Sequence, residues 1–310
     1  MINDSLGDRM KKYEAVSKTT LVSRMPVIIR LDGCHFHTFT RGFEKPFDDV
    51  MIEAMQKTMK YLCENIQGCV LGYTQSDEIT LVLVDYKKLN SDAWFDNEVQ
   101  KMCSVSAAMA TYAFNKYFNE LHLDRIAKNC GEDQYDLAHD KARRTGAYFD
   151  SRVFNVPRED VTNCLLWRQK DAERNSVNSL AQSLFSHKSL QGLKLKDTIA
   201  KIETEKGIIW GELPTTQKRG SCCVKDIKFV LPDGQEVKNN SKITYNGTDG
   251  TFYWDEDGYY FVSPAVIVQG GRAEKLEVKE TSKWIIDNDI PRFNEDRDYI
   301  EKLVYPVEEE

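Results

Sequence analysis

"VIIRLDGCHFHTFTRGFEKPFDD", residues 27 to 49, is the stretch that decides the fold. Its apolar beginning predicts a buried strand over Val27–Leu31. Asp32 and Gly33 follow directly, so this strand ends in a carboxylate and a glycine. The loop beyond them is rich in histidine and phenylalanine and runs to a proline. Asp48 and Asp49 then predict the start of a helix, because carboxylates favour the positive N-terminal end.

The segments that follow suggest how this strand is paired. Residues 51–66 repeat apolar side chains at helical spacing. Residues 69–85 hold two apolar runs around the polar quartet 75–78, a pattern typical of a hairpin with its tip at the quartet. Residues 97–117 indicate a second helix. Strand, helix, hairpin and helix, completed by one more strand, make the split β-α-β-β-α-β sheet of ferredoxin-like α+β proteins.

The second half of the chain has a different character. Residues 141–220 are expected to be helix-rich, and residues 224–269 read as a β-meander with Asp-Gly turns. We therefore predict two domains. The first, residues 1–140, would carry the split sheet, and the second, residues 141–310, would carry the helices and the meander.

The composition limits the classes of function. The net charge of −7 argues against a protein coated in non-specific nucleic-acid contacts, although a local basic groove remains compatible with it. No apolar run approaches the length of a membrane span, and the N-terminus lacks the apolar segment of a signal peptide. We expect a cytoplasmic protein with no membrane partner. The 8 cysteines form no C-x-x-C pair, which argues against a zinc site.

Two carboxylates form the strongest candidate site. Asp32 ends the first strand and Asp77 lies at the hairpin tip, and these elements are neighbours in a split sheet. Converging carboxylates repel unless a cation lies between them, and Mg²⁺ commonly bridges carboxylates and phosphates. Gly33, which lacks a Cβ, would let the backbone approach a metal or a triphosphate. The alternative is an ordinary Asp-Gly turn and a solvated hairpin tip.

Other residues of the loop fit a phosphate site. The amides of residues 33–37 could form an anion nest, and Lys45 and Lys101 are candidate triphosphate partners. His35 and His37 are equally compatible with loop or stacking roles. The P-loop, the G-x-G-x-x-G loop, the G-x-S-x-G elbow and the H-E-x-x-H motif are all missing from the sequence.

Basic clusters in the helix-rich region suggest an RNA partner, although each could be a solvated surface. They are Lys141-Arg143-Arg144, Arg168-Lys170, His187-Lys188 and Lys218-Arg219.

Taken together, several motifs resemble the tRNA-His guanylyltransferase family, most closely its bacterial and archaeal guanylyltransferase-like members. They are Arg30-Leu31-Asp32-Gly33, Phe36, Phe39, Phe43-Glu44-Lys45-Pro46, Gln75-Ser76-Asp77-Glu78, Trp94-Phe95, Lys101, Phe149-Asp150-Ser151-Arg152, Trp167-Arg168-Gln169 and Gln217-Lys218-Arg219-Gly220. The resemblance covers most of the chain. It implies a 3′-to-5′ nucleotide polymerase with a polymerase-type palm.

The resemblance also implies roles for residues. Asp32, Asp77 and the carbonyl of Gly33 would hold two Mg²⁺ ions, and the two aspartates would be catalytic. The nucleotide-binding set would be Asp32, Gly33, Cys34, His35, Phe36, His37, Lys45, Ser76, Asp77 and Lys101. The RNA-binding set would be Arg143, Arg144, Arg152, Arg168, Lys188, Lys218 and Arg219.

In this family ATP activates the 5′-phosphate of a tRNA, and the 3′-hydroxyl of an incoming nucleotide such as GTP then attacks it. Two departures stand out in the sequence. Eukaryotic members carry His-Ile-Asn-Asn-Leu-Tyr-Asn where this chain has residues 173–179, of which only Asn175 is kept, and Glu98 replaces a basic residue. The departures favour templated repair of 5′-truncated tRNAs over strict action on tRNA-His.

Two alternatives stay open at this stage: a catalytically inactive tRNA-binding protein and a palm-type nucleotide cyclase. Family members tend to be homotetramers, and the same assembly is expected here.

Overall fold

The computed structural model describes residues 5–129, 134–237, 241–245, 248–255, 258–262, 274–276 and 278–305. The chain divides into two compact units. The first comprises Met1–Val224 with Ile286–Glu310, and the second comprises Lys225–Ile285. The boundary predicted at residue 140 falls inside a helix, α5, so the structure divides the chain at a different place.

One antiparallel sheet has the strand order β11-β5-β2-β3-β1-β4, in which β1 to β4 belong to the first unit while β5 and β11 each continue from one unit into the other. In the second unit, β10-β9-β8-β7 form a sheet of their own. The strands are β1 (Val27–Gly33), β2 (Cys69–Gln75), β3 (Glu78–Leu83), β4 (Phe149–Asn155), β5 (Ser221–Val230), β6 (Glu236–Val237), β7 (Lys242–Tyr245), β8 (Thr248–Asp255), β9 (Gly258–Val262), β10 (Glu274–Leu276) and β11 (Lys279–Asp287).

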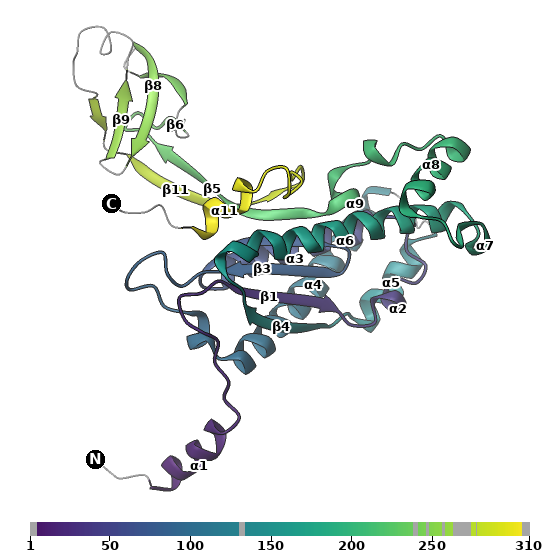
Figure 1. The fold of residues 1–310 in the computed structure, drawn as a ribbon, viewed down its shortest axis with the longest axis horizontal. Coiled ribbons are helices and arrows are strands. Elements are labelled where there is room, and N and C mark those ends of the chain that lie inside the picture. Colours follow the sequence, from purple (N-terminus) through teal and green to yellow (C-terminus); the bar gives the residue numbers. More distant parts are fainter. Residues whose placement is uncertain are drawn as a thin grey trace. The chain divides into compact units, whose positions relative to one another are not determined.

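The helices of the first unit are α1 (Ser5–Ala15), α2 (Phe36–Phe39), α3 (Asp49–Asn65), α4 (Val99–Asn129), α5 (Asp136–Thr145), α6 (Arg158–Leu184), α7 (His187–Leu190), α8 (Leu195–Lys206), α9 (Thr215–Arg219) and α11 (Asp298–Val304), with 3₁₀ turns at Trp94–Asn97 and Trp210–Glu212. Of these, α3, α4, α6 and α11 pack on the sheet (Figure 1). Among the described residues no helix is both long and apolar enough to cross a bilayer.

The mixed α+β class is confirmed. Along the chain the elements run β1, α3, β2, β3, α4 and β4, with β1 hydrogen-bonded between β3 and β4. The predicted hairpin is confirmed as β2 and β3. The helix predicted after Asp48 is α3, whose first turn is capped when the Asp48 carboxylate accepts the Met51 amide at 2.9 Å. The second predicted helix is α4, which continues to Asn129.

The core of the first unit explains why the apolar residues of β1, Val27–Ile29 and Leu31, are buried. On one face, α6 and α11 contribute Val161, Leu165 and Ile300 to a cluster that includes Ile28 and Val82 of the sheet. Elsewhere α3 packs on β2, and α4 packs on β4 and α3. Because both sides are covered, β2 and β3 are apolar runs rather than alternating ones.

The second unit has a separate apolar core that includes Phe229, Val237, Phe252 and Phe261. Its antiparallel strands β7, β8 and β9 lie where the sequence predicted a β-meander over residues 224–269. The last seven residues of that range lie outside the described part of the chain.

Candidate functional site

Asp32 and Asp77 lie at the same end of the sheet, as their places in the sequence predicted. Asp32 pairs in register with Glu78, which directly follows Asp77. The amide of Gly33 donates to the carbonyl of Asp77 over 3.0 Å. Burial raises the pKa of Asp77, the hydroxyl of Ser76 at 3.0 Å opposes this, and the negative charge of Asp32 raises the pKa further. The two carboxylates are therefore close enough to repel.

A third carboxylate, Asp150 of β4, lies on the other side of Asp32. The two residues pair in register across the β1–β4 ladder. The Asp150 carboxylate lies 3.5 Å from the guanidinium of Arg152 and 3.9 Å from Sγ of Cys34. Burial and the charge of Asp150 raise the pKa of the Cys34 thiol. Asp150 was not among the predicted site residues, because the sequence does not reveal which strand pairs with β1 on this side.

Gly33 is required for a reason other than the predicted one. A Cβ at this position would lie 2.3–2.7 Å from the ring of Phe36. That ring is buried and packs at 5.4 Å and 5.2 Å from the rings of Phe114 and Phe149. The missing Cβ makes room for an aromatic side chain of the same loop. The predicted approach of the Gly33 backbone to a metal or a triphosphate stays a prediction.

The predicted anion nest is also smaller than the sequence suggested. The amides of Gly33 and Cys34 donate to backbone carbonyls at 3.0 and 2.9 Å. His35 adopts a left-handed backbone with φ 57°, and α2 begins directly after it. The amides that open this helix have no acceptor within it. A backbone nest for an anion is therefore confined to residues 35–37.

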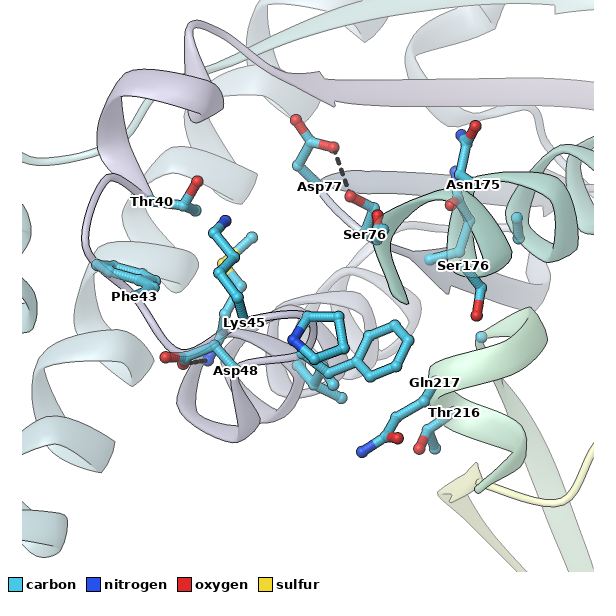
Figure 2. A pocket seen from close by; sticks show the side chains of 18 of the residues that line it. Thr40, Phe43, Lys45, Asp48, Ser76, Asp77, Asn175, Ser176, Thr216 and Gln217 are labelled. Carbon is cyan, nitrogen blue, oxygen red and sulfur yellow. Dashed lines mark hydrogen bonds between the residues drawn. The ribbon is translucent and has the colours of Figure 1, made fainter. Parts of the chain in front are cut away.

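A pocket of about 400 Å³ opens beside the hairpin tip (Figure 2). Four segments line it: the loop before α3, the tip between β2 and β3, α6, and α9. Its polar and aromatic lining includes Phe36, His37, Thr40, Phe43, Lys45, Asp48, Ser76, Asp77, Asn175, Ser176, Ser179, Thr216, Gln217, Lys218 and Arg219. Figure 2 shows the amino group of Lys45 extending from the loop toward the hairpin tip.

The pocket brings together residues that the sequence analysis both found and missed. Lys45, predicted as a phosphate partner, is exposed and forms no ion pair with any described residue. The side chains from α6 were not predicted as site residues, although Asn175 was noted. Ala172, Asn175, Ser176 and Ser179 are small or polar and recur at the spacing of one helical face, a signal that was present in the sequence.

Lys101, by contrast, is not brought to this site within the chain. It lies in the first turn of α4, just after Glu98, which forms an isolated bridge with Thr20 in the segment leading to β1. Asp32 lies at the opposite end of that strand. Lys101 instead pairs with Glu98 at 3.7 Å. Its predicted role as a triphosphate partner stays a prediction, which the position of Lys101 within one chain does not support.

Arg168 is also placed differently from the prediction. It was expected to contact RNA, but it is buried in α6 and donates through Nε at 2.7 Å, and through a second nitrogen, to the buried carboxylate of Glu78. Burial would lower the pKa of Arg168, and the bonds and charge of Glu78 raise it above its usual value. The ion pair between Arg168 and Glu78 therefore holds α6 against the sheet beside Asp77.

The remaining basic residues predicted to contact RNA keep some exposure: Arg143, Arg144, Arg152, Lys188, Lys218 and Arg219. Several hold local ion pairs, such as those of Arg143 and Arg144 with Asp140. Lys218 and Arg219 lie at the pocket. Burial lowers the pKa of Lys218, and the positive charges of Arg219 and Arg292 lower it further, which indicates a concentration of positive charge at this edge.

Comparisons with known proteins agree with this arrangement. A family model described as tRNAHis guanylyltransferase matches residues 7–157. A solved bacterial tRNA(His) guanylyltransferase (Thg1)-like protein in complex with ATP has a TM-score of 0.70 and 36% identity, covering 97% of this chain and 99% of that chain. The same kind of bacterial protein in complex with GTP has a TM-score of 0.65 and 35% identity, covering 97% of this chain and 100% of that one.

Curated relatives extend the comparison. The uncharacterized protein R259 of Acanthamoeba polyphaga mimivirus is 30% identical over 276 residues, covering 83% of this chain and 91% of that protein. The tRNA(His) guanylyltransferase 2 of Arabidopsis thaliana is 24% identical over 268 residues, covering 80% of this chain and 46% of the plant protein.

The fold and these relatives define the chain as an enzyme of the nucleotidyltransferase class. More narrowly, the chain belongs to the tRNA(His) guanylyltransferase family, and the resemblance found in its sequence motifs is confirmed.

Proposed function

We propose that the protein adds nucleotides to the 5′ end of tRNA in the 3′-to-5′ direction, and that its main task is templated repair of 5′-truncated tRNAs. One observation carries the proposal. Asp77, whose pKa is raised by burial and by the nearby charge of Asp32, lines an open pocket that also holds Lys45, a cation with no ion pair among the described residues. The bacterial relatives in complex with ATP and GTP support a nucleotide as the occupant of such a site.

Asp32, Asp77 and the carbonyl of Gly33 would hold Mg²⁺ in a palm-like sheet. The donors fit this ion, since all are oxygens. The pKa of Asp77 is raised first by burial and then by the charge of Asp32, and a bound cation would offset both effects. When bound, two such ions would lower the pKa of the attacking hydroxyl and screen the phosphate charges.

The chain's own groups would orient the nucleotide. Lys45 would neutralise part of the triphosphate, while the Ser76 hydroxyl and the amides of residues 35–37 would donate to its oxygens. The pocket volume of about 400 Å³ lies within the range of small-molecule sites. Asn175 and Gln217, from α6 and α9, supply amide groups suited to the base or ribose.

The tRNA would approach along the basic edge that includes Lys218 and Arg219. Relaxed substrate choice is supported by Glu173, which stands where eukaryotic members carry the first histidine of their motif. Its carboxylate is engaged by Arg292 at 3.2 Å and Arg219 at 3.5 Å. A side chain held in these ion pairs is poorly placed to read one particular nucleotide.

The test uses purified protein, Mg²⁺, ATP, the four nucleoside triphosphates and two labelled RNAs. One RNA is tRNA-His without its extra 5′ guanosine, and the other is a tRNA missing its first templated nucleotide. We expect faster extension of the truncated tRNA. If only tRNA-His is extended, the function is dedicated guanosine addition and the proposed repair activity is wrong. Extension of neither, with a cyclic nucleotide product or with tRNA binding alone, would favour the cyclase or the inactive binding protein.

Assembly and location follow from the family resemblance. We propose a homotetramer that works in the cytoplasm, and light scattering of the purified chain tests the assembly.

A further inference from the structure

A second group of metal-binding side chains is buried between α4 and α5. His122 comes from α4, and Asp136 and His139 come from α5. One ligand atom from each residue lies within 4.8 Å of those from the other two. Both histidines are 0% exposed and Asp136 is 2% exposed. None of the three lines the nucleotide pocket.

The two imidazoles lack the hydrogen bonds that burial normally demands. Both ring nitrogens of His122 and Nδ1 of His139 have no hydrogen-bond partner among the described residues. Unsatisfied buried polar atoms are rare and often mark an ion. Burial lowers the pKa of His122, and His139 lowers it further against the opposing charge of Asp136.

Asp48 sets the orientation of His139. Its carboxylate lies 2.9 Å from Nε2 of His139. Burial alone would raise the pKa of Asp48, but His139 and the amides of Met51 and Glu44 lower it below its usual value. A hydrogen bond from Nε2 to this carboxylate leaves Nδ1 as the His139 nitrogen that faces a metal. Histidines that bind metals through one nitrogen commonly donate from the other to a carboxylate in this way.

Aromatic packing alone is an insufficient explanation. The ring of Phe43 lies perpendicular to His139 at 4.5 Å, and that of Phe118 lies at 5.6 Å. These contacts account for the burial of His139. They leave three ring nitrogens without a hydrogen-bond partner in the described part of the chain, next to the carboxylate of Asp136, which also lies 3.4 Å from Nε of Arg125.

We propose that His122, Asp136 and His139 bind one zinc ion or a similar transition-metal ion. Imidazole nitrogens suit such ions, whereas Mg²⁺ prefers oxygen donors and would not compete well. Three protein ligands leave a fourth tetrahedral position for solvent. The expectation against a zinc site rested on cysteine spacing, and these ligands contain no cysteine.

The site would stiffen the wall of the nucleotide pocket. Asp48 bonds to His139, caps α3 and accepts the Glu44 amide at 3.2 Å. It also lines the pocket close to Lys45. A metal that fixes His139 therefore fixes Asp48 and the loop that carries Lys45. The proposal concerns metal content and does not depend on the proposed reaction.

The test measures bound metal directly. Untagged protein, incubated with Zn²⁺ and freed of excess by gel filtration, is expected to hold about one zinc per chain by mass spectrometry. His122→Asn and His139→Asn are each expected to lose most of it, while His187→Asn, an exposed histidine of α7, retains it. Wild-type protein with no more zinc than His122→Asn would overturn the proposal.

Wild-type protein alone also tests the site if the histidine variants fail to fold. Removal of the metal by a chelator is expected to lower the melting temperature, and Zn²⁺, but not Mg²⁺, is expected to restore it. A melting temperature that responds to neither treatment would count against a bound metal.

A matched pair of variants tests Asp48 as a positioning residue. Asp48→Asn is expected to weaken zinc binding by about 10–100-fold, as other losses of a ligand's hydrogen-bond partner do. Asp49→Asn makes the same charge change at an exposed neighbouring position and should leave the zinc affinity unchanged. Equal zinc affinities for both variants would remove Asp48 from the site.

Discussion

Asp77 and Glu78 are neighbours in the sequence and carry the same charge, but their surroundings are opposite. Glu78 is buried and accepts two hydrogen bonds from the buried Arg168. Asp77 faces a hydroxyl and the carboxylate of Asp32, and no described lysine or arginine lies within ion-pair distance of it. The protein neutralises the charge of Glu78 with its own Arg168. No described lysine or arginine does the same for Asp77, which is why we propose that a bound cation neutralises it. That difference separates a structural carboxylate from a candidate catalytic one.

The largest effect is expected from Asp77→Asn. Nucleotide addition should fall by on the order of a thousandfold or more, since metal-bound oxygens supply several kcal/mol of transition-state stabilisation. The stability of the metal-free protein should stay equal or rise, because one of two repelling carboxylates is gone. Single-turnover extension assays and urea unfolding measure the two quantities, with the exposed Asp92→Asn as control. Activity within tenfold of wild type would mean that Asp77 is not a catalytic ligand.

Glu78→Leu should produce the opposite result. It leaves the buried Arg168 with only Asp171, 3.3 Å away, as a carboxylate partner, and loss of one partner of a buried pair costs up to about 3–5 kcal/mol of unfolding free energy. The double variant Glu78→Leu with Arg168→Met should recover most of that loss, because well-packed apolar residues often replace a buried ion pair. Urea unfolding of the single and double variants measures both. A loss below about 1 kcal/mol would place this pair among weak surface ion pairs.

The comparison also shows what the sequence could and could not predict. Asp32 and Asp77 were placed correctly because an apolar strand and a hairpin fix their positions by local pattern. Arg168 was predicted to contact RNA because the sequence of a helix does not distinguish a basic residue that faces solvent from one that faces a buried carboxylate. The position of Lys101 at the other end of the sheet from Asp32 could not be predicted, because local pattern does not show at which end of the sheet a helix begins.

Other parts of the site depend on contacts between distant segments. Asn175 and Gln217 reach the pocket from helices that lie about a hundred residues or more beyond the hairpin tip. His122 and His139 come together only because α4 and α5 pack against each other, and the spacing of the two residues in the sequence does not predict that contact. The sequence pointed to Gly33, but the reason for a glycine there is visible only in the folded loop, where a Cβ would meet the ring of Phe36.

A smaller effect is expected from Lys218→Ala at the basic edge of the pocket. Loss of one phosphate contact should weaken binding of all tRNAs similarly and reduce the salt dependence of log K by about one. Fluorescence anisotropy across a salt series measures this slope. Lys196→Ala, an exposed lysine on α8, is the control. An unchanged slope would show that Lys218, whose amino group donates to the Gly211 carbonyl, is occupied within the protein.

The smallest effect is a difference in pH dependence between two buried carboxylates, Asp77 and Asp48. The pKa of Asp77 is raised in the folded chain, first by burial, so its contribution to stability is present below its unfolded pKa and lost as pH rises through the folded value. Burial also opposes ionisation of Asp48, but His139 lowers its pKa overall. Its contribution is therefore present above the unfolded pKa and lost as pH falls through the folded value.

Unfolding free energies measured from about pH 3 to pH 7 in chelator should separate the two carboxylates, because this range spans the ordinary pKa of aspartate. Asp77→Asn should gain stability relative to wild type toward pH 7, and Asp48→Asn should lose it. Mg²⁺ should remove the gain of Asp77→Asn, since a cation bound by wild type favours the ionised carboxylate. If the difference in unfolding free energy from wild type changes in the same direction with pH for both variants, the contrast between the unneutralised Asp77 and the neutralised Asp48 does not hold.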